Sequence, residues 1–221
     1  MKNKRVINII IAVLFFIAYG VFTYAVTTYD RQPIAPDGSL VGFASFNLKA
    51  REALGSSELW HELTTVMGFL ALLICFIFFM IGLVQLVKGK SLKKVDSDII
   101  CLGILYAVVI VLYVFFNKYT INVRPILEDG IAESSYPSSH AMLGITVFGS
   151  LLIEIKRRIG DPSKALIESI GCLFFVAITV IGRLLSGIHW ATDIIGAVLI
   201  SIALLFAFNA ILPPRKAQNR E

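Results

Sequence analysis

The chain has 221 residues, of which 57% are hydrophobic and 16% charged, and its formal net charge at pH 7 is +5. Soluble domains are usually about half apolar and a quarter charged, and the apolar excess here falls in separate runs long enough to cross a bilayer. This composition excludes an ordinary soluble domain and predicts an integral membrane protein. The basic residues cluster at the ends of the apolar runs, which is typical of membrane proteins and does not indicate nucleic-acid binding.

The apolar runs predict an all-α, polytopic membrane protein with about six transmembrane helices, built as one membrane-embedded domain over residues 1–221. In chain order, the expected spans are 6–28, 63–87, 99–117, 139–155, 165–182 and 189–212. The first run follows a basic start, as a signal peptide does, but it is longer than a signal core and no small-residue cleavage site closes it. We therefore expect an uncleaved anchor.

Three polar stretches, 29–62, 118–138 and 183–188, form the expected loops on one side of the membrane. The first of them mixes prolines and glycines with scattered phenylalanines, leucines and a tryptophan, which indicates a loop with a short helix lying on the membrane surface. The opposite side carries 14 of the 20 basic residues: Lys2, Lys4, Arg5, Lys88, Lys90, Lys93, Lys94, Lys156, Arg157, Arg158, Lys164, Arg215, Lys216 and Arg220. Because lysine and arginine favour the cytoplasm, we expect both termini inside the cell and the three loops on the extracytoplasmic side of the cell membrane.

The cysteines and one of the histidines give no sign of a metal site. Cys75, Cys101 and Cys172 lie inside apolar runs without the spacing of a zinc ligand set, which favours small buried apolar residues over a disulfide or a zinc site. His61 lies at a membrane boundary, and a single histidine there is interpreted as a boundary residue.

Ionisable residues interrupt the apolar sequence between the last two expected spans. Arg183, His189 and Asp193 lie there, where a charge is costly to keep. If a helix starts near His189, Asp193 lies one turn further along on the same face, where its carboxylate can orient the imidazole and stabilise its cationic form. Arg183 offers a planar, permanently charged group suited to phosphate oxygens. This stretch therefore indicates chemistry on a phosphate at a membrane surface.

Two further polar elements are expected on the same side of the membrane. The first consists of Lys118 and Arg124-Pro125, and the second of Pro137-Ser138-Ser139-His140. A Pro-Ser-Ser-His turn at the start of a helix can point backbone N–H groups at an anion. Together with the third element they supply cations to polarise phosphate oxygens, a histidine to attack phosphorus and a histidine to protonate the departing oxygen.

The chain resembles the type 2 phosphatidic acid phosphatase superfamily in three elements, which are, in reverse chain order, Arg183-x5-His189-x3-Asp193, Pro137-Ser138-x-His140 and a Lys/Arg-Pro element. The resemblance implies a six-helix membrane fold and hydrolysis of lipid phosphates through a phosphohistidine, with no metal and no cofactor. It also implies these roles by position: His189 as nucleophile, Asp193 as its orienting partner, His140 as general acid, and Lys118, Arg124, Ser138, Ser139 and Arg183 as phosphate-binding residues.

The chain departs from the family pattern at three positions. One residue fewer than usual separates Lys118 from Arg124. Ser139 stands where the family usually has glycine, and Gly182 stands where a serine often precedes the arginine. None of these differences removes a nucleophile, an acid or the central arginine.

We expect hydrolysis of a lipid phosphate or diphosphate at the outer membrane face, with undecaprenyl diphosphate, phosphatidylglycerol phosphate and phosphatidic acid as the leading substrates. The expected partners are this substrate and the membrane lipids, without nucleic acid, and the sequence leaves the oligomeric state open. The alternative is a non-catalytic lipid-phosphate binding or transport protein of the same fold. Intact His140, His189 and Asp193 favour catalysis, because binding alone needs only the cations.

Overall fold

The computed structural model describes residues 2–127 and 130–213. Within them, six helices are long and apolar enough to cross a membrane. They are α1 (Lys2–Thr28), α3 (Glu58–Gly89), α4 (Ser97–Lys118), α5 (Ser139–Arg158), α6 (Pro162–Leu185) and α7 (Ala191–Ile211). The expected all-α membrane protein with six spans is confirmed. Of the three cysteines expected to be small buried residues, Cys172 is buried, whereas Cys75 and Cys101 are partly exposed.

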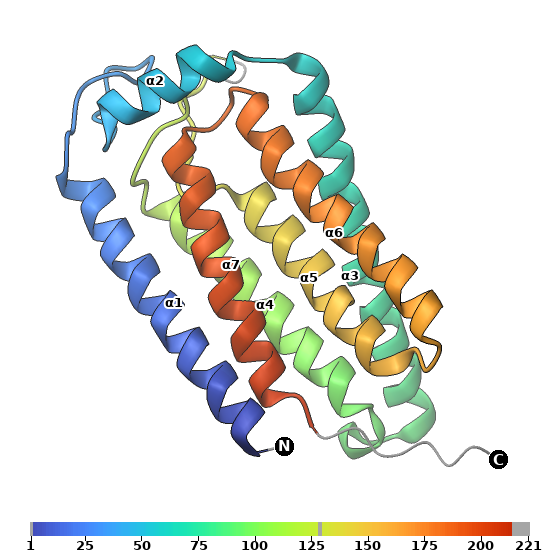
Figure 1. Cartoon of the computed structure of the whole chain (residues 1–221). Coiled ribbons are helices and arrows are strands. Elements are labelled where there is room, and N and C mark those ends of the chain that lie inside the picture. Colours follow the sequence, from blue (N-terminus) through green and yellow to red (C-terminus); the bar gives the residue numbers. More distant parts are fainter. Residues whose placement is uncertain (1, 128–129, 214–221) are drawn as a thin grey trace.

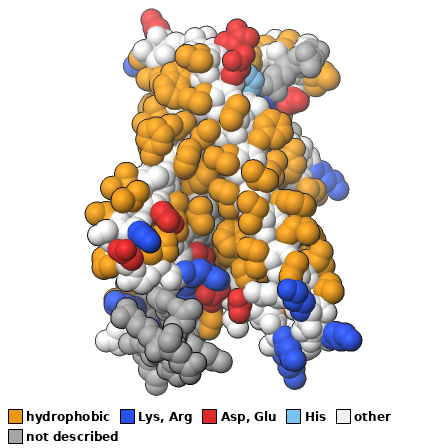
Figure 2. Space-filling view, turned by 90° about the vertical axis from the view of Figure 1, so that its right-hand side faces the viewer, with side chains coloured by type: hydrophobic (Ala, Val, Ile, Leu, Met, Phe, Trp, Pro, Cys, Tyr) orange, Lys and Arg blue, Asp and Glu red, His pale blue; other side chains and the backbone are white. Residues whose placement is uncertain are grey.

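The bundle is built around α5 and α7. In the most apolar part of α5, 61% of the residues are buried inside the protein, against 6% for α3. Helix α1 packs along α7, and α6 packs along α5 (Figure 1). Hydrophobic side chains cover the middle of the face shown in Figure 2, while its lysines and arginines lie mainly toward the lower end. The protein therefore presents an apolar belt suited to lipid, with charged groups gathered toward the ends.

A short helix, α2 (Ala44–Leu54), lies across one end of the bundle (Figure 1). It falls within the first expected loop, so the prediction of a short helix in residues 29–62 is confirmed. At the opposite end, the 3₁₀ turn η1 (Leu92–Lys94) joins α3 to α4. The end that carries α2 is the one where the predicted site residues lie.

The helix starts near the site follow from local capping. Helix α5 begins at Ser139 because the Ser138 hydroxyl accepts a hydrogen bond from the N–H of Ala141 at 3.4 Å. Helix α7 begins at Ala191, two residues later than the expected start at 189, because the preceding Trp190 has an extended backbone and its N–H is bonded by the Asp193 side chain. His189 therefore lies in the loop before α7. A helix does start near His189, and Asp193 lies in its first turn on the side of the histidine, although the helix does not include His189 itself.

Tyr136 fastens the second loop to the bundle. Its hydroxyl shares a hydrogen bond of 2.8 Å with that of Thr23 on α1, and its ring lies parallel to the ring of Tyr19, with centroids 6.4 Å apart. Gly196 of α7 lies against the same ring, so that an added Cβ would come within 2.6 Å of a ring carbon. The glycine provides the space that this aromatic ring needs.

We therefore expect Gly196→Ala to lower the free energy of unfolding by about 1–3 kcal/mol, the usual cost of overpacking a close-packed interior. The matched control is Gly171→Ala on α6, where an added Cβ would meet nothing within 4 Å. Thermal unfolding in detergent micelles measures both variants. Equal stability of the two variants would contradict this account of Tyr136.

Candidate active site

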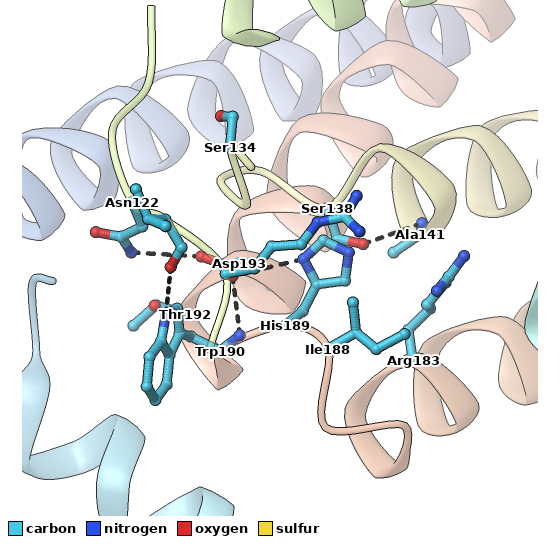
Figure 3. Close-up of polar contacts among 12 residues, drawn as sticks. Asn122, Ser134, Ser138, Ala141, Arg183, Ile188, His189, Trp190, Thr192 and Asp193 are labelled. Carbon is cyan, nitrogen blue, oxygen red and sulfur yellow. Dashed lines mark hydrogen bonds and ion pairs between the residues drawn. The ribbon is translucent and has the colours of Figure 1, made fainter. Parts of the chain in front are cut away.

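The tight turn between α6 and α7 returns the chain toward the bundle and places His189. The Ser186 hydroxyl donates to the carbonyl of Arg183 at 2.8 Å and accepts from the N–H of Ile188 at 3.4 Å. Gly187 has a φ of +70°, a conformation that glycine adopts without strain. His189 follows two residues later and is buried, facing the first turn of α7 (Figure 3).

His189 and Asp193 face each other, although no helix joins them. Nδ1 of His189 lies 3.6 Å from Oδ2 of Asp193, and both side chains are buried. The carboxylate is held from two further directions: Oδ2 accepts from the N–H of Trp190 at 2.9 Å, and Oδ1 accepts from the Nδ2 amide of Asn122 at 3.4 Å (Figure 3). A carboxylate fixed in this way can orient the imidazole through Nδ1, which leaves Nε2 for a substrate.

The surroundings of His189 favour its neutral form. Burial lowers the pKa of His189, and the positive charges of Arg124 and Arg183 act in the same direction, while Asp193 opposes them. A lowered pKa keeps the imidazole unprotonated at neutral pH, which is the state a nucleophile requires.

The Pro-Ser-Ser-His element lies beside this pair. The N–H of Ser138 donates to the backbone carbonyl of Asp193 at 3.1 Å, so this contact joins the start of α5 to the start of α7. The prediction that the turn points free N–H groups at an anion therefore does not apply to Ser138, whose hydroxyl is also used to cap α5. Ser139 and His140 are partly exposed in the first turn of α5.

The predicted cations differ in their placement. Arg124 is ion-paired with Glu133 at 3.1 Å, and its backbone N–H donates to the carbonyl of Glu133 at 3.0 Å. Arg183 is buried in the last turn of α6, and both arginines act electrostatically on His189. Lys118 is exposed at the end of α4, with its ammonium 5.7 Å from the centroid of the Tyr119 ring. The structure brings the two arginines to the histidines, whereas a phosphate contact by Lys118 stays a prediction.

Two cavities meet at His140. A polar one of about 370 Å³ is lined by both histidines and by Arg124, Glu133 and Ser139, together with other residues of α4 and the second loop. An apolar one of about 310 Å³ lies between α3, α4 and α5, where Phe69, Leu72, Val109, Ile110 and Leu143 line it. His140, Ser139, Tyr113 and Met142 line both. The arrangement can hold a molecule with a polar head and an apolar tail, with the bond between head and tail close to His140.

Three residues near the site were not predicted from the sequence. Buried Asn122 connects Asp193 to the first loop, since its Oδ1 accepts from the N–H of Gly42 at 3.2 Å. Buried Asn47 on α2 makes two hydrogen bonds with Thr192. Its Nδ2 amide donates to the Thr192 hydroxyl at 3.0 Å, and its Oδ1 accepts from the Thr192 N–H at 3.2 Å. The third is His61, whose Nδ1 lies 3.4 Å from Nη1 of Arg183, so its interpretation as a simple boundary residue is incomplete. No sequence motif marks these residues, because each of them makes hydrogen bonds to an element far away in the chain.

Fold and site together define a multi-pass membrane protein with two histidines, a buried carboxylate and two arginines gathered at one end of its helical bundle. The family model of the PAP2 superfamily matches residues 64–217, so the chain belongs to this superfamily of phosphatases, as its three motifs predicted. Helix α1 lies outside the matched residues.

One solved structure with the same fold is the crystal structure of the "first transmembrane PAP2 type phosphatidylglycerolphosphate phosphatase" from Bacillus subtilis. The two chains are 17% identical, with a TM-score of 0.65, and the match covers 90% of this chain and 94% of the other. At this identity the likeness shows a shared fold. No curated protein gives a significant match to the chain.

Proposed function

We propose that the protein hydrolyses a lipid phosphate or diphosphate through a phosphohistidine formed on His189, without a metal ion. The observation that carries the proposal is the buried pair of His189 and Asp193, of which His189 lines a cavity also lined by His140 and Arg124. Membership of the PAP2 superfamily supports phosphatase chemistry at this site. Among residues 2–127 and 130–213, no group of three or more His, Cys, Asp or Glu side chains could hold a metal ion, and the proposed steps use protein side chains alone.

In the first step, Nε2 of His189 attacks phosphorus, and the bond from phosphorus to the ester oxygen breaks. His140 gives its proton to that oxygen, so the lipid leaves as an alcohol, or as a monophosphate if the substrate is a diphosphate. In the second step, water attacks the phosphohistidine and gives a proton to His140, which releases phosphate and restores both histidines. Asp193 stabilises the imidazolium that forms during attack, and Arg124 and Arg183 stabilise the charge on the non-bridging oxygens.

The two cavities support an amphiphilic substrate. The apolar cavity begins beside His140 and is open toward the lipid-facing side of α3 and α4, where Phe69 is 68% and Ile110 62% exposed. A tail entering there from the bilayer would place its head in the polar cavity, with the bond to be broken near His140. Undecaprenyl diphosphate, phosphatidylglycerol phosphate and phosphatidic acid all have this form.

A phosphate-release assay on these three lipids in detergent micelles tests the proposal. We expect release from at least one of them, retention of activity in EDTA, and inhibition by orthovanadate, which mimics five-coordinate phosphorus. Activity that is lost in EDTA and restored by magnesium would overturn the metal-independent mechanism. Binding of all three lipids without any turnover would favour a non-catalytic binding or transport protein.

We also propose that both termini are cytoplasmic and that the site faces the extracytoplasmic side of the cell membrane, because the sequence pattern assigns 14 of the 20 basic residues to the side opposite the three loops. Three of these 14, Arg215, Lys216 and Arg220, lie outside the residues that the structure describes. Single cysteines at Gly130 and Gly160 test this orientation in a background without the three native cysteines. Both positions are exposed, and an added Cβ meets nothing within 4 Å at either. We expect a membrane-impermeant thiol reagent to label intact cells only at position 130. Labelling only at position 160 would reverse the topology, and permeabilised cells serve as the control for reactivity.

A further inference from the structure

The first turn of α3 brings a third histidine to the site. Nδ1 of His61 lies 3.4 Å from Nη1 of Arg183, in the last turn of α6. Arginine has no acceptor and stays protonated, so the guanidinium donates and Nδ1 of a neutral His61 accepts. Arg183 is only 2% exposed. The contact is thus made to the buried arginine that is expected to bind phosphate.

A glycine allows α3 to come this close to α6. A Cβ at Gly182 would lie 2.5 Å from the Thr64 methyl group and 2.9 Å from the ring of Trp60. The Thr64 hydroxyl donates to the carbonyl of Trp60 at 2.8 Å, which is consistent with its methyl group facing α6. Gly182 is the position where the family often has serine, and a serine side chain would not fit against α3 here. The departure from the family pattern and the contact of His61 with Arg183 therefore share one cause.

The same face of α3 reaches the proposed general acid. His61 and Gly68 are separated by two helical turns and so lie on one face. At Gly68 an added Cβ would be 3.0 Å from Cδ2 of His140. One stripe of α3 thus lies against both the arginine and the acid.

We infer that His61 is a positioning residue, which holds the guanidinium of Arg183 in the orientation that binds the phosphate oxygens. The inference rests on the proposed function, in which Arg183 is a phosphate-binding residue. A guanidinium binds two oxygens only when its plane is correctly turned. Removing the acceptor at position 61 takes away one of the contacts that orient the side chain of Arg183. A single hydrogen bond of this kind corresponds to about a 5- to 10-fold change in affinity.

The test compares three variants with the full-length wild type in detergent. His61→Ala removes the acceptor, and His61→Asn keeps one, because the asparagine amide oxygen can take the approximate place of Nδ1. Glu62→Gln, at the next and exposed position of α3, is the matched control. Affinities for inorganic phosphate and orthovanadate are measured by calorimetry, KM and kcat by phosphate release, and stability by thermal unfolding.

We expect His61→Ala to weaken binding of both anions about 5- to 10-fold and to raise KM by a similar factor, with the unfolding temperature unchanged. His61→Asn should recover most of this loss, and Glu62→Gln should behave as the wild type. Unchanged anion affinity in His61→Ala, an equal loss in His61→Asn, or a loss that follows a fall in the unfolding temperature would each overturn the inference. If the wild type binds the anions but hydrolyses no lipid, the proposed function fails, while the anion affinities still decide the role of His61.

Discussion

His189→Ala is expected to abolish phosphate release from every substrate, by at least about 1,000-fold in kcat, because the attacking nitrogen is lost and no other described residue occupies its position. In the proposed mechanism, the buried contact of 3.6 Å between Nδ1 of His189 and Oδ2 of Asp193 orients the imidazole so that Nε2 attacks the substrate. Rapid quenching of the wild type with a ³²P-labelled lipid phosphate should trap label on the protein, and the variant should show none.

Asp193→Asn provides the matched comparison for this result. The amide cannot stabilise the imidazolium as a carboxylate does, so kcat should fall, while KM changes little because Arg124 and Arg183 remain. Trapped phosphoprotein in His189→Ala, with unchanged turnover and intact folding, would place the nucleophile elsewhere. A large rise in KM with unchanged kcat in Asp193→Asn would indicate that the carboxylate shapes binding instead of chemistry.

The second large effect is expected from His140→Ala, and it should depend on the leaving group. A lipid alkoxide is a poor leaving group that needs a proton as it departs, whereas p-nitrophenolate is nearly stable without one. General acid catalysis typically contributes about 100- to 10,000-fold. We therefore expect kcat to fall by about that factor with a lipid monophosphate and by much less with p-nitrophenyl phosphate.

The position of His140 supports this asymmetry. It lies where the polar and the apolar cavity meet, which is where the bond between phosphate and tail would be placed. Measuring kcat for both substrates with each histidine variant separates the two roles. Equal losses on both substrates in His140→Ala would remove the support for a general acid at this position.

The sequence by itself determined the class of fold and most of the candidate site. Six long, continuously apolar runs favour membrane-spanning helices, because backbone N–H and C=O groups in a bilayer core must be bonded within the protein and a helix bonds them within its own segment. The strands of a membrane barrel are shorter and alternate between apolar and polar residues. Costly ionisable residues next to such runs marked His140, Arg183, His189 and Asp193 as functional candidates before any contact was known.

Only the tertiary structure decided how these residues meet. The approach of His189 to Asp193 depends on the turn at Gly187 and on the capping of α7, instead of on a helix that spans both residues. The N–H of Ser138 donates to the backbone carbonyl of Asp193, and no local sequence pattern predicts this hydrogen bond.

The contacts of Asn122 and His61 show the same limit most clearly. Asn122 reaches Asp193 across 71 residues of sequence, and His61 reaches Arg183 across 122. Periodicity and motif spacing describe neighbours along one element, whereas these contacts arise from the packing of separate helices and loops. Such packing depends on side-chain volumes at positions like Gly182, where the absence of one Cβ lets α3 meet α6.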